Sequence, residues 1–297
     1  MTDTKFAPII IFAFNRPDNL RALLSSLTKC NNYINSPIYI FIDGHRNQSD
    51  LELIDETQAV CTEFMQLFDV FSIQRSSINK GLAASLISGI TSVFEKHDRA
   101  IVLEDDLILS EDFIDYMNSS LERYAGDQRV SAISGFSTKI SSAKKNVINY
   151  FHPRPCSWGW ATWKDRWERC EWNYKPGSLR EYISLWFNCR RAGQDVFRMY
   201  RNQLKGKINS WAIRWTIYSI RHNKFVSYPY VSRVYNSGFG HNATHCKGAN
   251  PFPCDFGTDE LQTKKFESSF EYRKDVISEV NFYHSNLYKL RIKLGVV

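Results

Sequence analysis

Three consecutive carboxylates, Glu104, Asp105 and Asp106, are the residues of this sequence with the clearest chemical use. They follow an apolar run at 100–103 that is typical of a buried strand. Two unit charges about 4 Å apart repel by about 4 kcal/mol at an effective dielectric of 20, so such a cluster needs open water or a cation. Mg²⁺ and Mn²⁺ bind carboxylate oxygens together with substrate phosphates. The triplet predicts either a solvated acidic turn or a site for a divalent cation.

The geometry expected around the triplet divides its side chains. In a strand, Glu104 and Asp106 would face one side of the sheet and Asp105 the other, so a metal and a neighbouring hydroxyl could each have a carboxylate. After a short apolar step, Ser110 is typical of an N-cap, and the acidic residues at 111–112 favour the first turn of a helix. The acids therefore lie at the carboxyl end of a strand, before a loop and a helix.

The first hundred residues alternate predicted strands with predicted helices. Apolar runs rich in β-branched residues predict strands at 8–14, 37–42, 69–74 and 100–103. Helices are predicted from Pro17 onward, over 50–68, and on the apolar stripe Leu82, Leu86, Ile90 and Val93. This alternation predicts an α/β fold with a mainly parallel sheet and right-handed crossovers. Later strands are expected at 130–134 and 225–228, and later helices at 178–191 and 210–221.

Polar residues gather where these strands end. Asn15 and Arg16 follow the first strand, Asp43 follows the second, and Asn79 and Lys80 lie in the turn before the third helix. Ligands bind at this edge of open α/β sheets. There a guanidinium can pair with a phosphate, and a carboxylate can accept a hydrogen bond from a base or ribose. Ordinary solvated turns are the alternative.

The pattern changes at about residue 150, where an aromatic-rich stretch begins. Trp160, Trp163 and Trp167 have helical spacing, which predicts one shared helical face. Such rings can form an ordinary core or a platform for a sugar. Further on, the Gly-rich segment 234–253 carries His241 and His245 and is expected to be a loop; an imidazole there could reach a metal, although a loop histidine without any ligand role is the alternative.

Composition limits the class of protein. The chain has 297 residues, 43% hydrophobic and 14% aromatic, as expected of a globular protein with a large core. A formal charge of +7 favours an anionic ligand or membrane surface, and no zinc-finger spacing or RNP signature indicates nucleic acid. No apolar run approaches the ~20 residues that span a bilayer. Seven scattered cysteines and the lack of a signal sequence predict reduced thiols and a cytoplasmic location.

The segment 282–297 contains Lys289, Arg291 and Lys293 but no acidic residue, with leucines on one helical side. It predicts a weakly amphipathic basic helix. Such a helix could lie peripherally on an anionic membrane, or it could simply dock on the protein.

Several of these segments together resemble a known family. The loop FAFNRP, the strand end FIDGH and above all VLEDDLILSEDF are similar to GT-A-fold glycosyltransferases, most of all the N-acetylglucosaminyltransferase I type, in which V-x-E-D-D-L precedes an acid-Phe pair. The similarity continues more faintly through PCSWGWATWKDRW, INSW and the THC segment. It implies a mixed, mainly parallel sheet flanked by helices, with a nucleotide-sugar half at 1–135, an acceptor-binding catalytic half at 136–270 and a basic helix at 271–297.

The resemblance also implies an activity and a set of roles. The expected reaction is an inverting transfer from a nucleotide sugar, most often a UDP-sugar, to a saccharide or lipid-linked saccharide. Separately from the resemblance, the lack of a signal sequence and the basic tail favour a bacterial cytoplasmic enzyme of surface-polysaccharide synthesis. Asp106, with His245 near the diphosphate, would hold Mn²⁺ or Mg²⁺. The nucleotide-sugar site would comprise Asn15, Arg16, Asp43, Asn79, Lys80, Glu104 and Asp105, and the acceptor site Trp158, Trp160 and Trp211.

The sequence departs from the family at the expected catalytic base. That base is the first Asp of a Trp-Asp-Asp-Trp stretch, and the matching stretch here, 208–211, has Asn209 in its place. Asparagine cannot take up a proton. A substituted, inactive variant, a base elsewhere (Asp165, Glu168 or Asp195) and a different alignment remain open. The first interpretation predicts that Asn209→Asp raises turnover by orders of magnitude.

Two other classes compete with the transferase. A sugar nucleotidyltransferase needs a Gly-rich loop after the first strand, and FAFNRPDNL has no glycine. A non-catalytic carbohydrate-binding protein of the same ancestry would use the tryptophans without a nucleotide, and Asn209 keeps this possibility open.

Overall fold

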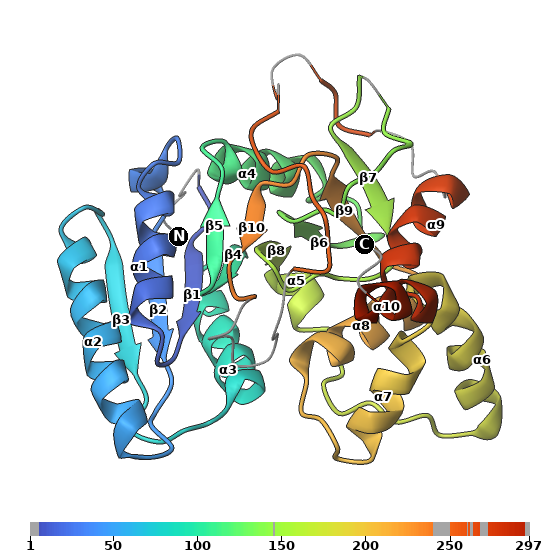
Figure 1. Cartoon of the computed structure of the whole chain (residues 1–297), viewed down its shortest axis with the longest axis horizontal. Helices are drawn as coiled ribbons and strands as arrows, with labels where there is room; N and C mark the ends of the chain where they lie inside the picture. The colour runs from blue at the N-terminus through green and yellow to red at the C-terminus, as the bar shows by residue number, and fades with distance from the viewer. Residues whose placement is uncertain are drawn as a thin grey trace.

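The computed structural model describes residues 6–144, 146–239, 250–259, 261, 264–267 and 273–294. One large sheet crosses the molecule, and helices cover both of its faces (Figure 1). The described strands follow the order β3-β2-β1-β4-β8-β6-β9-β7, and β5 and β10 form a separate pair.

The helices and strands have the following bounds. The first half contains β1 (Ile9–Ala13), α1 (Pro17–Leu27), β2 (Ile38–Ile42), α2 (Gln48–Met65), β3 (Phe71–Arg75), α3 (Leu82–Phe94), β4 (Arg99–Glu104), β5 (Leu107–Leu109), α4 (Phe113–Arg123) and β6 (Val130–Ser134). The second half contains β7 (Asn149–His152), β8 (Trp160–Trp163), α5 (Lys164–Trp167), α6 (Leu179–Cys189), α7 (Val196–Leu204), α8 (Trp211–Arg221), β9 (Phe225–Pro229), β10 (Val234–Asn236), α9 (Lys274–Tyr283) and α10 (Asn286–Lys293). Short 3₁₀ turns lie at Tyr33–Asn35 and Arg190–Ala192.

The sheet is mixed, with a parallel first half. Strands β3, β2, β1 and β4 are mutually parallel, β8 runs antiparallel between β4 and β6, and β9 is parallel to β6 and antiparallel to β7. The predicted class, a mixed α/β sheet flanked by helices, is therefore confirmed. The sheet continues from the first half of the chain into the second, so the expected boundary between residues 135 and 136 divides one continuous sheet.

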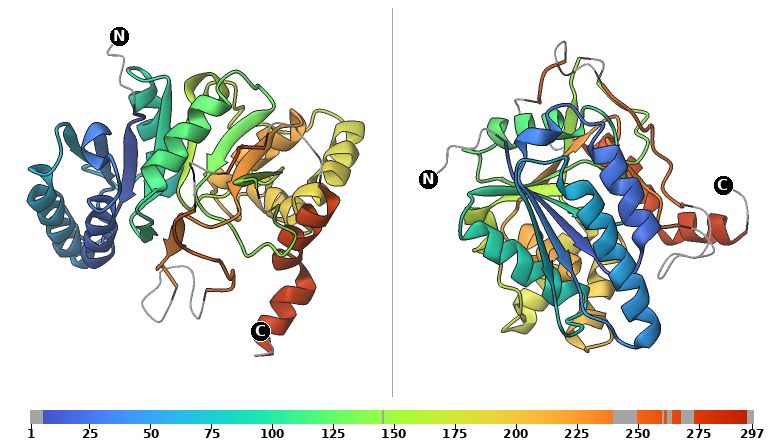
Figure 2. Two further views of the ribbon diagram at one scale, coloured as in Figure 1. Left: turned by 90° about the horizontal axis from the view of Figure 1, so that it is seen from above. Right: turned by 90° about the vertical axis from the view of Figure 1, so that its left-hand side faces the viewer.

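The sequence pattern explains how the two faces are covered. All five residues of β1 are buried, as expected for a strand packed on both sides. Ile9 and Ile11 join a core with α1, α2 and α4, whereas Ile10 and Phe12 join a core with α3 and α8. In the right-hand view of Figure 2, the sheet separates α3 from α1 and α2. The apolar strands thereby fix the direction in which each loop leaves the sheet.

Two sequence-based expectations about local structure are wrong. The helix expected to begin at Ser110 begins at Phe113, because the Ser110 hydroxyl donates to Asp112 Oδ1 at 2.6 Å rather than capping a helix. The expected helical face of tryptophans does not form, because Trp160 and Trp163 belong to β8, and only Trp167 lies in a helix. Pairing of β8 with β4 overrides the helical spacing.

The C-terminal segment forms two helices rather than the one expected. Helix α9 ends at Tyr283, and Ser285 caps α10 by accepting from Tyr288 N–H at 3.1 Å. Tyr288 is buried, whereas Leu290 and Leu294 are 52% and 67% exposed. Among the described residues, the helices are too short or too polar to cross a bilayer.

Burial of a histidine predicts sensitivity to acid. His152 is fully buried at the end of β7, and its Nδ1 accepts from Arg154 N–H at 3.1 Å. Burial, with a smaller effect of the Arg154 charge, lowers the pKa of His152 to about 3. The unfolded chain, with an ordinary pKa of about 6.5, therefore binds the proton first, so the free energy of unfolding falls as pH drops from about 6.5 toward 3, by up to about 4 kcal/mol.

The test compares His152→Asn, whose amide oxygen can still accept a hydrogen bond, with the unmodified chain in denaturant titrations between pH 7 and 4. The variant should lose less stability over this range. Equal losses in the two proteins would show that His152 is not responsible.

Candidate functional site

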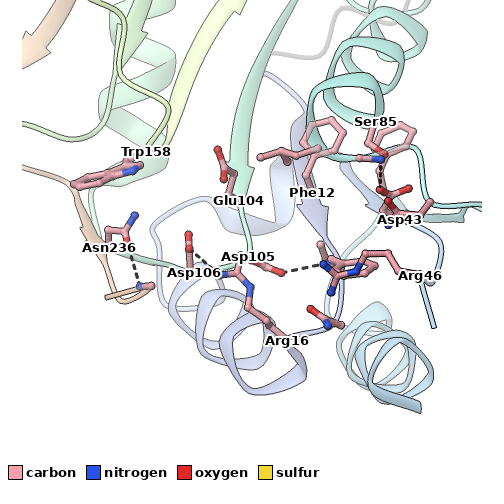
Figure 3. A pocket seen from close by; sticks show the side chains of 18 of the residues that line it. Phe12, Arg16, Asp43, Arg46, Ser85, Glu104, Asp105, Asp106, Trp158 and Asn236 are labelled. Atoms are coloured by element: carbon pink, nitrogen blue, oxygen red, sulfur yellow. Dashed lines mark hydrogen bonds and ion pairs between the residues drawn. The ribbon is translucent and has the colours of Figure 1, made fainter. Parts of the chain in front are cut away.

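A cavity of about 300 Å³ opens at the carboxyl ends of β1, β2 and β4. The acidic triplet lies in its centre, with Trp158 on one side and Asp43 on the other (Figure 3). The sequence-predicted residues that line it are Asn15, Arg16, Asp43, Asn79, Glu104, Asp105, Asp106 and Trp158. Strand ends far apart in sequence therefore converge here, as the α/β pattern predicted.

Arg16 organises the triplet. Strand β4 ends at Glu104, so Asp105 and Asp106 lie in the turn before β5 and do not alternate between two faces as expected. Both carboxylates accept from the Arg16 guanidinium, Asp106 from Nη1 at 3.0 Å. Phe14 N–H donates to Asp105 Oδ2 at 3.3 Å. Arg16 was expected to contact a phosphate; in this structure it pairs with the acids.

The cavity brings more carboxyl groups together than Arg16 pairs with. Burial raises the pKa of Glu104 to about 8, with further contributions from Asp106 and Asp105. Burial also raises the pKa of Asp105 to about 6, although the Arg16 charge opposes this shift. The Glu104 carboxyl faces the cavity and has no ion pair or hydrogen bond to another described residue (Figure 3). At neutral pH Glu104 therefore favours its protonated form, and a bound cation would instead favour the ionised carboxylate.

The donor set fits a hard divalent ion bound jointly with phosphate. Mg²⁺ sites commonly use one or two carboxylates, and the substrate phosphates and water supply the other ligands. Both Asp105 and Asp106 pair with Arg16, but Asp106 is the carboxylate that would hold the ion, because its side chain is 15% exposed and that of Asp105 only 1%. The described chain contains no group of three acidic, histidine or cysteine side chains arranged as a complete metal site. His245, the other expected ligand, lies outside the described residues.

Asp43 acts first on the protein itself. Its carboxylate accepts from the backbone N–H groups of Gly44 at 3.0 Å and of Lys80 and Gly81 at 2.9 Å. Asn79 Nδ2 donates to Gly44 O at 2.7 Å. A side chain at Gly44 would lie 2.8 Å from Asn79 N, so only glycine permits this approach. Lys80 therefore contributes a backbone group, and its side chain does not line the cavity.

Arg46 lines the cavity and was missed in the sequence. Its Nε donates to Asp50 Oδ2 at 2.8 Å, and Asn15 Nδ2 donates to Asp50 Oδ1 at 2.7 Å. The Arg46 guanidinium lies 4.8 Å from the centroid of the Phe14 ring. Its side chain is 53% exposed and offers a positive charge at the mouth of the cavity. Asp43 was selected because ligands bind where the strands of such a sheet end. The same reasoning applies to the residues directly after Asp43 and could have found Arg46.

The other missed wall follows β10. Strand β10 pairs antiparallel with β5, and Ser237 N–H donates to Asp106 O at 2.8 Å. This brings Asn236 and Phe239 to the cavity. A side chain at Gly238 would overlap the Asp106 carboxylate, lying 2.8 Å from its Cγ. No local sequence pattern predicts this wall, because it depends on the pairing of β10 with β5, which are more than a hundred residues apart in the sequence.

Two of the three expected acceptor tryptophans are in the core. Trp160 is 1% exposed and Trp211 is 4% exposed, and their rings stack with centroids 5.1 Å apart. Trp215 and Trp167 pack on the same cluster. The expected role of Trp160 and Trp211 as a sugar platform is therefore corrected to a core role. Trp158 alone of the three lines the acidic cavity.

The structure does not place Asn209 beside the acids. Asn209 lines a different cavity, on the outer side of α3, and its Oδ1 accepts from Arg214 Nη2. Nor do the other bases considered line the acidic cavity. Asp165 pairs with Arg166, and Asp195 with Arg154.

With Asn209 in this position, the large gain in turnover expected from Asn209→Asp is no longer expected. A carboxylate at this position would pair with Arg214 instead of facing the acidic cavity, so turnover should change by less than about twofold, within the range of an exposed ion pair. Sugar transfer or donor hydrolysis by the variant and the unmodified chain is the measurement. A gain of a hundredfold or more would restore Asn209 to the base position.

No family model matches the chain. Among solved structures, it is similar to the 1–349 fragment of S. aureus TarS, with 8% identity and a TM-score of 0.45 over 78% of this chain and 60% of that one. It is also similar to the mannosyltransferase PcManGT from Pyrobaculum calidifontis in complex with GDP-Man and Mn²⁺, with 10% identity and a TM-score of 0.40 over 62% and 52% of the two chains. A second TarS structure matches with 8% identity and a TM-score of 0.45 over 78% and 36%. The chain thus spans 60% or less of each of these proteins.

Proposed function

We propose that the chain is a metal-dependent glycosyltransferase of the GT-A type, which transfers a sugar with inversion from a nucleoside diphosphate sugar, a UDP-sugar, to a saccharide. The observation that carries this proposal is the acidic turn at the carboxyl edge of the sheet, where Asp106 lines a cavity together with the carboxyl groups of Glu104 and Asp105. The Glu-Asp-Asp motif and its resemblance to the N-acetylglucosaminyltransferase I type support the same assignment.

The lining residues divide into roles along the cavity. Asp106 would hold Mn²⁺ or Mg²⁺, which when bound neutralises charge on the departing diphosphate. Arg16 and Arg46 are the cations placed to receive phosphate oxygens, Arg16 by exchanging part of its contact with the acids. Glu104, which faces the cavity without a partner among the described residues, would accept hydrogen bonds from sugar hydroxyls.

The far end of the cavity suits the nucleotide. Phe14 and Phe41 line it, and Asn15 and Asn79 add amide groups for a base or ribose. The Asp43 carboxylate accepts backbone hydrogen bonds on both oxygens, so we propose that it shapes this end of the site and contacts the base with its remaining lone pairs.

Calorimetry with UDP and GDP, each with and without Mn²⁺, tests the proposal. A transferase of this type should bind a nucleoside diphosphate at least about tenfold more tightly with Mn²⁺ than without it. A carbohydrate-binding protein would bind neither nucleotide, and that result would refute the proposal. Nucleotide binding that is independent of metal would refute the role of Asp106.

Membrane association and a role in bacterial surface-polysaccharide synthesis stay predictions. Helix α10 supports the first, because it exposes Leu290 and Leu294 beside Arg291 and Lys293. Sedimentation with anionic vesicles, compared with neutral ones, is the direct test. Equal recovery with both would contradict electrostatic docking on a membrane.

A further inference from the structure

A second cavity of about 350 Å³ adjoins the acidic one at Trp158, whose side chain lines both. The Trp158 ring packs against Phe136 and Phe252, which line the second cavity, with centroid separations of 4.6 and 5.5 Å. On the other side it packs against Phe239 of the acidic cavity, at 5.5 Å. Ligands in the two cavities would therefore lie on either side of the Trp158 ring.

The walls of the second cavity come from the second half of the chain. Its polar lining includes Thr138, Arg154, Asp195 and Lys289, drawn from the loop after β6, the loop after β7, the N-cap of α7 and helix α10. Its apolar lining is formed by Tyr150, Met199, Ile213, Tyr228 and Val280. Aromatic and aliphatic walls with a few converging polar groups are typical of a small-molecule site.

The charges in this cavity do not cancel. Arg154 Nη1 donates to Asp195 Oδ1 at 2.7 Å, and Lys289 Nζ lies 3.2 Å from Asp195 Oδ2. One carboxylate thus faces two cations. Burial holds the pKa of the lining His284 well below its ordinary range, so this imidazole adds no charge at neutral pH. One positive charge remains, next to a first cavity that is lined by Glu104, Asp105 and Asp106.

Two further observations indicate a preformed site. Gly193 has φ +131°, and a side chain there would lie 2.9 Å from Arg154 Nη1 and 3.1 Å from Asp195 Oδ1, so a backbone without a side chain fits closely around the ion pair. Thr138 is 5% exposed and lines the cavity, yet its hydroxyl has no hydrogen-bond partner among the described residues. A buried hydroxyl without a partner is costly unless a ligand satisfies it.

We propose that the second cavity binds the acceptor saccharide through an anionic group, a carboxylate or a phosphate, which is received by Lys289 and Arg154 while Thr138 hydrogen-bonds the sugar. Lys289 is the side chain free to turn toward this group, because 42% of it is exposed, whereas the buried Asp195 keeps Arg154 as its partner. The inference names the substrate class for the proposed transferase and rests on that function.

Ligand-observed NMR titrations of the full chain test the charge preference. The probes are glucuronic acid for a carboxylate, glucose 6-phosphate for a phosphate, and glucose as the neutral sugar of the same size. We expect the better anionic probe to bind about tenfold more tightly than glucose, with the advantage shrinking at high salt. The anionic probe that binds more tightly than glucose identifies whether the bound group is a carboxylate or a phosphate. Equal binding of all three probes would overturn the proposal.

Matched variants locate the binding. Lys289→Met should reduce the preference for the anionic probe about fivefold or more, whereas Lys293→Met, on the exposed side of the same helix, should leave it unchanged. Thr138→Val should weaken binding of all three probes without loss of folding, because it removes a hydroxyl that has no hydrogen-bond partner in the described part of the chain. Unchanged binding by both Lys289→Met and Thr138→Val would overturn the assignment.

The same titrations with UDP and Mn²⁺ separate this inference from the proposed function. Competition between UDP and the anionic probe would place the probe in the acidic cavity and overturn the inference. Anionic preference that depends on Lys289 in a chain that binds no UDP would uphold the second site and refute the transferase.

Discussion

Asp106→Asn is expected to weaken metal-dependent nucleotide binding by about 100-fold. The variant keeps the size of the side chain but removes the one carboxylate of the turn that faces the cavity and is not deeply buried. When a carboxylate becomes an amide, the site for a hard cation loses a negative charge and a strong ligand. Losses of metal affinity of this size are typical of altered metal sites. Calorimetry with UDP and Mn²⁺ measures the effect.

The matched control is Asp98→Asn. Asp98 is an exposed carboxylate that precedes β4, so it lies at the opposite end of the same strand. This variant should bind UDP and Mn²⁺ like the unmodified chain. If both variants bind normally, the cation does not use Asp106.

Arg16→Met is expected to reduce the free energy of unfolding by about 1 to 2 kcal/mol near neutral pH, and by more as the pH rises. It removes the ion-pair partner of Asp105, whose side chain is 1% exposed, and an unpaired buried charge costs several kcal/mol. The sign of the pH dependence follows. Without Arg16 the pKa of Asp105, already raised to about 6, rises further, so protonation restores stability relative to the unmodified chain as pH falls through that value.

Two comparisons isolate this cause in denaturant unfolding. Adding Asp105→Asn to Arg16→Met should recover most of the lost stability. Arg21→Met, on the same helix, removes an exposed ion pair with Glu63 and should change the stability much less than Arg16→Met does. A loss in Arg16→Met that is the same at every pH, and that the second substitution does not recover, would mean that Asp105 is not the source.

The sequence predicted the half of the site that is built from parallel strands. Apolar runs located β1, β2 and β4 closely, and the edge rule then placed Asn15, Arg16, Asp43 and the acidic triplet together. It also identified the starts of α6 and α8, because Ser178 and Ser210 cap them as their types indicate. These features depend on local residues and on a topology that follows from them.

The features that escaped prediction depend on contacts distant in sequence. The wall at Gly238 exists because β10 pairs with β5, and no residue near it marks that pairing. The spacing of Trp160 and Trp163 is compatible with a helix, but pairing with β4 makes the segment a strand. The three acidic side chains were expected to alternate between the two faces of the sheet. Instead, β4 ends at Glu104, and the Arg16 guanidinium donates hydrogen bonds to the carboxylates of both Asp105 and Asp106.

Diffraction at the manganese absorption edge, from crystals grown with UDP and Mn²⁺, would show directly whether Asp106 holds the ion. We expect an anomalous peak within bonding distance of the Asp106 carboxylate and of diphosphate oxygens, in the cavity between Trp158 and Asp43. Bound UDP with no anomalous peak at Asp106, and with Arg16 still paired to that carboxylate, would contradict it.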